Sequence, residues 1–306
     1  MTWKKFLLGL KKSQKVGSLV VIILCLSAVI IAGCSLTKQA SLVEPENGKL
    51  KICTSFYPIY IMALNLVQDV PGVELLSIAP PDTGCLHDVH LSPVDLKTLA
   101  ESDIFIINGS GMEEYLEEVL TELPNLKVID STAGLNLTNP HAWVSVGLNI
   151  QQVRTIGEQL AELDPANKEK YLENMANYIA KLEELKDRMQ HSLASLTNRK
   201  IVTFHQAFPY LAEELDLEIL AVVQPEAGSE PSAKELAEII KLVRDHQVKA
   251  IFIEPQYPDG TAQVIARETG AKVYTLDPAA TGPLTADAYL QIMEKNLLTL
   301  QEALKE

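Results

Sequence analysis

The chain has 306 residues, of which 47% are hydrophobic and 22% are charged, and its formal net charge is −14. This apolar content is enough for a sizeable core and excludes a disordered protein, while the length favours two modest lobes over one large one. The acidic balance disfavours nucleic acid as a partner and attracts cations.

The first 33 residues have the composition of an export signal. Five lysines and no acidic residue lie within residues 1–15, and an apolar run follows over residues 16–33. The run ends in IAGC at 31–34, which resembles the cleavage site of bacterial lipoproteins, where the cysteine is acylated and becomes the new N-terminus. Removal of residues 1–33 takes away five positive charges, so the remainder carries −19.

We therefore expect lipid on Cys34 to anchor the protein in the bilayer, at the outer face of a bacterial cytoplasmic membrane. An uncleaved transmembrane anchor is the alternative, because the apolar run is close to the length that spans a bilayer. Residues 34–49 are polar and contain proline and glycine, which is typical of a tether between a lipid and a folded domain.

From residue 50 onward, short apolar runs alternate with amphipathic helical patterns, and this order predicts α/β lobes with parallel sheets. The expected strands are 50–54, 73–79, 103–108 and 127–130 in the first half, and 200–204, 218–223, 249–254 and 272–276 in the second. Two helix starts are also recognisable: Ser92 precedes Pro93 with Asp95 in the first turn, and Ser232 with Glu235 forms a capping box.

Between the halves, Asp164-Pro165 is expected to begin a long helix whose apolar residues recur every three or four positions as far as Leu196. At 1.5 Å per residue this helix is about 45–50 Å long, enough for a rigid strut spanning both lobes. A coiled-coil seam is the alternative, but it lasts too few heptads to be stable alone. The expected division is an N-terminal lobe at 50–164, a linking helix at 165–197 and a C-terminal lobe at 198–306.

Four side chains with metal-binding potential follow predicted strands, where ligands of open α/β sheets bind. His87 and His141 lie in loops after the strands at 73–79 and 127–130, whereas His205 and Asp277 directly follow those at 200–204 and 272–276. Each half supplies two of the four, so they converge if the lobes face each other. Three imidazoles and a carboxylate form a tetrahedral set that suits Zn²⁺.

Other histidines and cysteines near these positions have open roles. His90, three residues after His87, is a possible auxiliary ligand, and Cys53 and Cys85 could form a disulfide in an oxidising compartment. A thiolate ligand is the alternative use of Cys85, and the disulfide is preferred. We expect His191 and His246 to be solvated.

Several motifs together resemble the zinc- and manganese-binding solute receptors of ABC importers, over essentially all of residues 50–306. The motifs are His87, SPVDL at 92–96, NPHAW at 139–143, TFHQAFPY at 203–210, GSEPS at 228–232, IEPQ at 253–256 and LDP at 276–278. The resemblance implies two α/β lobes joined by a long rigid backbone helix, with a metal ion in the cleft and delivery to a membrane permease. The positions that match the ligands of the family are His87, His141, His205 and Asp277.

In that family the third ligand is histidine in zinc-type receptors and often glutamate in manganese-type ones, so His205 favours zinc. The sequence departs from the family pattern at Leu86, where proline is common, at His90, and in lacking a histidine-rich loop. We expect a monomeric zinc receptor without enzymatic activity. The alternatives are a manganese receptor of the same family, a zinc-dependent hydrolase and a surface adhesin; no HExxH motif supports the hydrolase.

Overall fold

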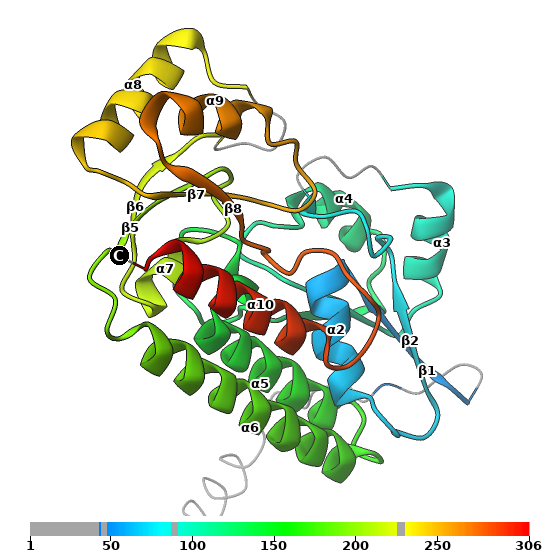
Figure 1. Ribbon diagram of the computed structural model, residues 1–306. Helices are drawn as coiled ribbons and strands as arrows, with labels where there is room; N and C mark the ends of the chain where they lie inside the picture. The colour runs from blue at the N-terminus through cyan, green and yellow to red at the C-terminus, as the bar shows by residue number, and fades with distance from the viewer. Residues whose placement is uncertain (1–42, 44–47, 87–90, 225–229, 306) are drawn as a thin grey trace, which may run out of the picture. The chain divides into compact units, whose positions relative to one another are not determined.

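The computed structural model describes residues 43, 48–86, 91–224 and 230–305, and these form two four-stranded parallel sheets with helices around them (Figure 1). The first sheet consists of β1 (Leu50–Thr54), β2 (Val73–Ser77), β3 (Ile104–Ile107) and β4 (Lys127–Asp130). The second consists of β5 (Lys200–Thr203), β6 (Glu218–Val222), β7 (Ala250–Ile253) and β8 (Lys272–Thr275). All eight predicted strands are present, and no strand end differs from the predicted one by more than two residues.

Both sheets have the same topology, with strand orders β2-β1-β3-β4 and β6-β5-β7-β8. In each sheet the chain passes first to one side of the central strand and then to the other, so the order reverses between β1 and β3 and between β5 and β7. The carboxyl ends of strands at such a reversal are where ligand-binding groups of open α/β sheets gather. Strand topology therefore places equivalent candidate positions in the two lobes.

Each lobe has its own covering helices. In the first lobe these are α2 (Tyr57–Leu66), α3 (Pro93–Ala100) and α4 (Glu117–Thr121), and in the second α7 (Pro209–Glu214), α8 (Ala233–Asp245) and α9 (Gly260–Thr269). The two predicted helix starts are confirmed. The Ser92 side chain accepts from the Asp95 N–H while the Asp95 carboxylate accepts from the Ser92 N–H, and Ser232 and Glu235 form the same reciprocal pair.

The lobes are joined by α5 (Val146–Leu163) and α6 (Lys168–Leu193), which lie side by side (Figure 1). The predicted start of the long helix at Asp164-Pro165 was wrong. The Asp164 carboxylate closes a loop between the helices by accepting from the Asn167 amide (2.7 Å) and the Tyr171 hydroxyl (3.0 Å). With 26 residues, α6 is about 39 Å long, and the sequence had not revealed α5 as its partner.

The apolar stripe of α6 packs into a core that both lobes share. Tyr171, Tyr178, Leu182, Leu185, Met189 and Leu193 are buried as the periodicity predicted. They belong to one continuous cluster that includes Ile52 and Ile104 from the first sheet and Ile201 and Phe252 from the second. A shared core resists movement of one lobe against the other, since interiors pack tightly.

The C-terminal helix α10 (Ala288–Ala303) returns to pack against α6 and α2 (Figure 1). Before it begins, the Asn65 amide donates to the Ala286 carbonyl (2.8 Å) and the Tyr57 hydroxyl to the Pro283 carbonyl (3.0 Å). A Cβ added to Gly282 would lie 2.5 Å from the Tyr57 hydroxyl oxygen, so a side chain there would push the segment before α10 away from α2. The last helix and the segment before it thus contact α2 in the first lobe. The residue limits of the lobes stay a prediction.

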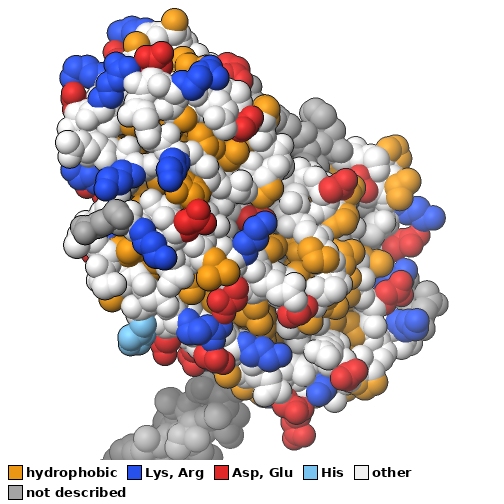
Figure 2. All heavy atoms as spheres, in the orientation of Figure 1, with side chains coloured by type: hydrophobic (Ala, Val, Ile, Leu, Met, Phe, Trp, Pro, Cys, Tyr) orange, Lys and Arg blue, Asp and Glu red, His pale blue; other side chains and the backbone are white. Residues whose placement is uncertain are grey.

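The described surface carries charges of both signs. Figure 2 shows lysine and arginine side chains interspersed with acidic ones on the face of α8, α9 and α10, and Arg244 pairs with Glu268 at 3.0 Å. Such exposed pairs contribute little to stability because water screens them. Within the described part of the chain, no helix is both long enough and apolar enough to cross a membrane. The apolar run at 16–33 and Cys34 lie outside it.

Candidate metal centre

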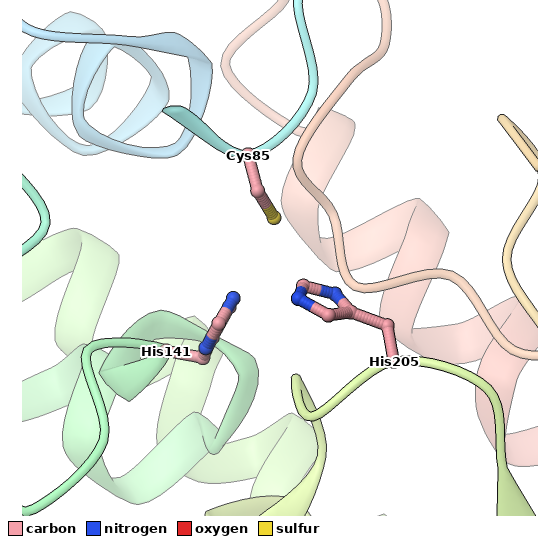
Figure 3. Close-up of side chains that lie close together, drawn as sticks. All are labelled: Cys85, His141 and His205. Carbon is pink, nitrogen blue, oxygen red and sulfur yellow. The ribbon is translucent and has the colours of Figure 1, made fainter. Parts of the chain in front are cut away.

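One group of potential metal ligands stands out among the described residues: Cys85, His141 and His205, whose ligand atoms all lie within 4.8 Å of one another. Figure 3 shows the Cys85 sulfur and the two imidazole rings pointing toward a common point from three different segments. The two rings are nearly perpendicular, with centroids 4.8 Å apart and an interplanar angle of 84°. Two predicted ligands, one from each lobe, therefore meet.

His205 is positioned by the strand order of the second sheet. It follows β5 after Phe204, and Glu254 follows β7, the neighbouring strand in which Phe252 pairs with Thr203. The two side chains therefore leave the sheet side by side, and His205 Nδ1 lies 3.1 Å from Glu254 Oε1. Both are buried, with only 3% and 1% of their surface exposed.

The Glu254 carboxylate sets the tautomer of His205. Its other oxygen accepts from the Gln256 amide at 2.7 Å. Burial raises the pKa of Glu254, and the neighbouring His205 ring opposes that rise. With Nδ1–H donated to the carboxylate, Nε2 is the ring nitrogen of His205 that carries the lone pair able to bind an ion, and the carboxylate fixes the orientation of the ring.

His141 receives equivalent support from an amide. Asn139 Oδ1 accepts from the His141 backbone N–H and lies 2.9 Å from His141 Nδ1. The orientation of the amide is set by Asn139 Nδ2, which donates to the Gln206 carbonyl at 3.0 Å. The Oδ1 atom therefore accepts from Nδ1–H, and Nε2 is the nitrogen of His141 that could bind an ion.

The loop that carries His141 is held by residues of both lobes. The Tyr210 hydroxyl, from the second lobe, accepts from the backbone N–H groups of Thr138 and Asn139, both at 3.0 Å. On the other side, the Asn108 amide donates to the Pro140 carbonyl at 2.8 Å. Ten residues separate His141 from the end of β4, so the strand itself does not fix the position of His141. The hydrogen bonds to the loop fix it instead.

Trp143, just after His141, is fully buried and anchored at both ends. Its indole Nε1 donates to the Pro278 carbonyl (2.7 Å), and its own carbonyl accepts from the Tyr289 hydroxyl (2.8 Å). The indole and the His141 imidazole have centroids 5.1 Å apart. A charge placed on His141 therefore lies close enough to alter the fluorescence of Trp143.

Asp277 is not within the 4.8 Å group of the described residues. Its Oδ1 accepts from the Ala279 N–H at 2.8 Å, and Asn296 on α10 holds its backbone through bonds of 2.9 and 2.6 Å. Burial raises the pKa of Asp277, and its charge in turn contributes to the raised pKa of Glu254. The carboxylate is thus near the site, but it does not join the imidazoles in this arrangement.

The two cysteines are separate free thiols, so the possible disulfide is not formed. Cys53 is fully buried in a small cluster with Phe105 and Leu116, and burial raises its pKa to about 12. Cys85 is only partly buried and lies among the histidines, where desolvation followed by the charge of Glu254 raises its pKa. From the sequence, a disulfide was the preferred role of Cys85 and a thiolate ligand the alternative. The geometry agrees with the alternative.

The remaining candidates fall into two groups. His87 and His90 lie outside the described residues, so their roles stay predictions. His191 and His246 are exposed, as expected: His191 Nδ1 lies 2.7 Å from the Asp187 carbonyl and His246 Nδ1 lies 3.3 Å from Lys200 Nζ. Glu254 and Asn139 were not identified from the sequence as partners of the candidate ligands. Signals existed for both, because Glu254 directly follows a strand and Asn139 is two residues before His141.

Each lobe has a parallel sheet, both lobes share a helical backbone, and imidazole groups from both lobes meet. These features define a metal-binding solute receptor of the type that serves ABC importers. The family model ZnuA, the periplasmic component A of a zinc-uptake complex, matches residues 52–303. The chain belongs to this family.

Several known proteins are similar over most of the chain. The high-affinity zinc uptake system protein ZnuA of Bacillus subtilis is 29% identical, covering 95% of this chain and 98% of that protein. The zinc-binding lipoprotein AdcA of Streptococcus pneumoniae is also 29% identical over 90% of this chain, which spans only 59% of AdcA.

Solved structures of two further proteins are also similar over most of the chain. The laminin-binding protein Lmb of Streptococcus agalactiae, described as a bifunctional protein with adhesin and metal-transporting activity, superimposes with a TM-score of 0.77 at 28% identity, covering 84% of this chain and all of that one. The solute-binding protein FpvC of Pseudomonas aeruginosa, in complex with Mn²⁺, has a TM-score of 0.76 at 31% identity, covering 84% of this chain and 98% of that one.

Proposed function

We propose that this protein captures zinc outside the cytoplasm and delivers it to the membrane permease of an ABC importer. The observation that carries the proposal is the meeting of His141 and His205 from opposite lobes, where a neighbour holds Nδ1 of each ring and Nε2 is the proposed ligand atom. An ion held there is shielded by both lobes, yet it is bound only by side chains that release it when they are protonated.

The proposed ligands are His87, His141, His205 and Asp277. His87 is included on its sequence position, two residues after Cys85, whose sulfur is part of the observed group. Asp277 is included because its charge helps to raise the pKa of Glu254, the partner of His205. Binding requires neutral imidazoles and an ionised carboxylate, so we expect affinity to fall as the pH drops through the range of histidine ionisation.

Zinc is preferred over manganese because imidazole suits the borderline zinc ion better than the hard Mn²⁺ ion. Manganese is the alternative within the same family, since FpvC was solved with Mn²⁺. The shared core of the two lobes supports a receptor that closes only slightly around its ion.

We further propose that the protein acts as a monomer, anchored through lipid on Cys34 to the outer face of the cytoplasmic membrane. The similarity to AdcA, named a lipoprotein, supports the anchor. We propose no catalytic activity, because the family consists of solute-binding proteins. An additional adhesin role is the second candidate, and the likeness to Lmb favours it.

Elemental analysis of protein purified without chelator, followed by zinc and manganese competition, tests the proposal. Metal binding is followed through the fluorescence of Trp143, the only tryptophan that remains after residues 1–33 are removed. We expect about one zinc per chain and displacement of manganese by zinc. A protein that binds neither ion, or that holds manganese against zinc, contradicts the proposal.

A further inference from the structure

The third member of the observed ligand group is a sulfur atom. Cys85 Sγ lies within 4.8 Å of a ring nitrogen of both His141 and His205, and Figure 3 shows it directed toward the space between the rings. Cys85 is also free of any disulfide. The four proposed ligands, His87, His141, His205 and Asp277, do not include this thiol.

We propose that the thiolate of Cys85 is a ligand of the captured ion. This inference rests on the proposed function, because it concerns the same ion. On binding, the sulfur forms a bond to the metal and its S–H proton passes to solvent, so no oxidant or reductant is needed.

The spacing of the three atoms supports coordination. In a tetrahedral zinc site, bonds of about 2.3 Å to sulfur and about 2.0 Å to nitrogen place sulfur and nitrogen about 3.5 Å apart. From separations of up to 4.8 Å, the atoms need to approach by only about 1 Å, which side-chain rotation can supply. The partial exposure of Cys85 leaves its segment accessible from solvent.

A thiolate at this position also gives the site a choice of donors. The proposed imidazoles and Asp277 already number four, and zinc in protein sites is almost always four-coordinate. Sulfur and carboxylate therefore compete for one position. A thiolate is the softer donor and suits zinc, whereas a carboxylate suits manganese, so Cys85 makes the site more selective for zinc.

The cobalt complex of the protein tests this assignment directly, because a thiolate bound to Co²⁺ gives a near-ultraviolet charge-transfer band that nitrogen and oxygen ligands do not give. We expect the band in the wild-type protein, its loss in Cys85→Ser, and its retention in Cys53→Ser. Cys53 is the matched control because it is the other described thiol and lies in a separate buried cluster. Circular dichroism checks that both variants fold.

The outcomes separate the two proposals. Cobalt and zinc binding without the band, or a band that survives Cys85→Ser, overturns the role of Cys85 and leaves the receptor function standing. Failure of wild-type protein to bind either ion overturns both.

Metal competition gives a second readout that does not depend on cobalt. Replacing the soft donor in Cys85→Ser should lower the preference for zinc over manganese by at least about tenfold, whereas Asp277→Asn should raise it. An unchanged preference in Cys85→Ser, with the fold intact, contradicts the inference.

Discussion

The two halves of the site both depend on a buried glutamate that follows an equivalent strand, but they use it differently. In the second lobe, Glu254 after β7 contacts the His205 ring directly. In the first lobe, Glu113 follows β3, and its two oxygens accept from the backbone N–H groups of Asn108 (2.8 Å) and Gly109 (3.0 Å). Glu113 thereby holds the backbone at Asn108, whose side-chain amide donates to the Pro140 carbonyl next to His141.

This difference separates electrostatic support from positional support. A carboxylate bonded to an imidazole makes that ring a better ligand, as Glu254 does for His205. The buried network around Asn108, where the Gln152 amide donates to the Asn108 amide oxygen (3.0 Å) and to Ser131 Oγ (2.8 Å), only fixes the place of the loop. Among the residues that support the histidines, we therefore expect mutations in the second lobe to change zinc affinity most, and those in the first lobe to have their larger effect on stability.

The largest effect is expected when His205 is replaced. Apparent zinc-binding energies of about 10–16 kcal/mol spread over four ligands give about 3 kcal/mol each, so His205→Ala should weaken zinc binding at least about a hundredfold. His141→Ala should lose somewhat less, because its supporting partner is a neutral amide. Competition titration against a zinc chelator measures both, with the exposed His191→Ala as the control. Equal binding by His205→Ala and the wild type would remove the basis of the comparison.

Glu254→Gln should follow, with a loss of about 10- to 100-fold in zinc affinity. The glutamine keeps the size of the side chain and an oxygen for the His205 Nδ1–H, but it removes the negative charge beside the ring. The fold should therefore persist, as circular dichroism would show. A fall in zinc affinity with an unfolding temperature of the zinc-free protein close to that of the wild type would support the electrostatic role of Glu254. Unchanged affinity with a lower unfolding temperature would make Glu254 a structural residue.

Much of the fold could be predicted from the sequence because its signals are local. Apolar runs of β-branched residues marked all eight strands, and the reciprocal Ser–acid pairs at Ser92 and Ser232 marked two helix starts. The start of α6 was misplaced because Asp164-Pro165 resembles a helix start, whereas the Asp164 carboxylate in fact bonds to Asn167 and Tyr171. That choice depends on tertiary contacts, which periodicity does not contain.

The site was harder to predict because its parts come together only through topology. His141 and His205 were found from their places after strands, and the structure brings them together. The partnership of His205 with Glu254 depends on β5 and β7 being neighbours, an order that the sequence alone did not specify. The position of Cys85 among the imidazoles likewise depends on the path of residues 78–86 after β2, which the sequence does not specify.

Asn139→Ala tests the first lobe at the level of the ligand partner. It removes the acceptor for His141 Nδ1 and the bond to the Gln206 carbonyl across the lobes. We expect about a tenfold loss of zinc affinity, at the lower end of the range for partners of ligands, because water can replace a neutral acceptor. The same change should lower the unfolding temperature, measured by calorimetry without zinc. A loss of affinity larger than that of Glu254→Gln would reverse the ranking of the two halves.

Glu113 should have the smallest effect on zinc binding and a distinct effect on stability. Burial raises its pKa from 4.5 to about 7 in the folded protein. Between these pH values the folded state keeps the proton that the unfolded state has lost, so the free energy of unfolding falls as pH rises, by about 3 kcal/mol at most across the window. Chemical denaturation of the zinc-free protein from pH 4 to 8 measures this slope.

Glu113→Gln cannot ionise, so it should remove that part of the pH dependence, although one backbone N–H loses its acceptor at a cost of about 1–3 kcal/mol. Its zinc affinity at neutral pH should stay within about threefold of the wild type, which corresponds to about 0.6 kcal/mol. Glu114→Gln, at the next position, is the matched control and should leave the slope unchanged. If Glu113→Gln instead weakened zinc binding as much as Glu254→Gln, the buried carboxylate of the first lobe would support its histidine electrostatically after all, and the two halves of the site would work alike.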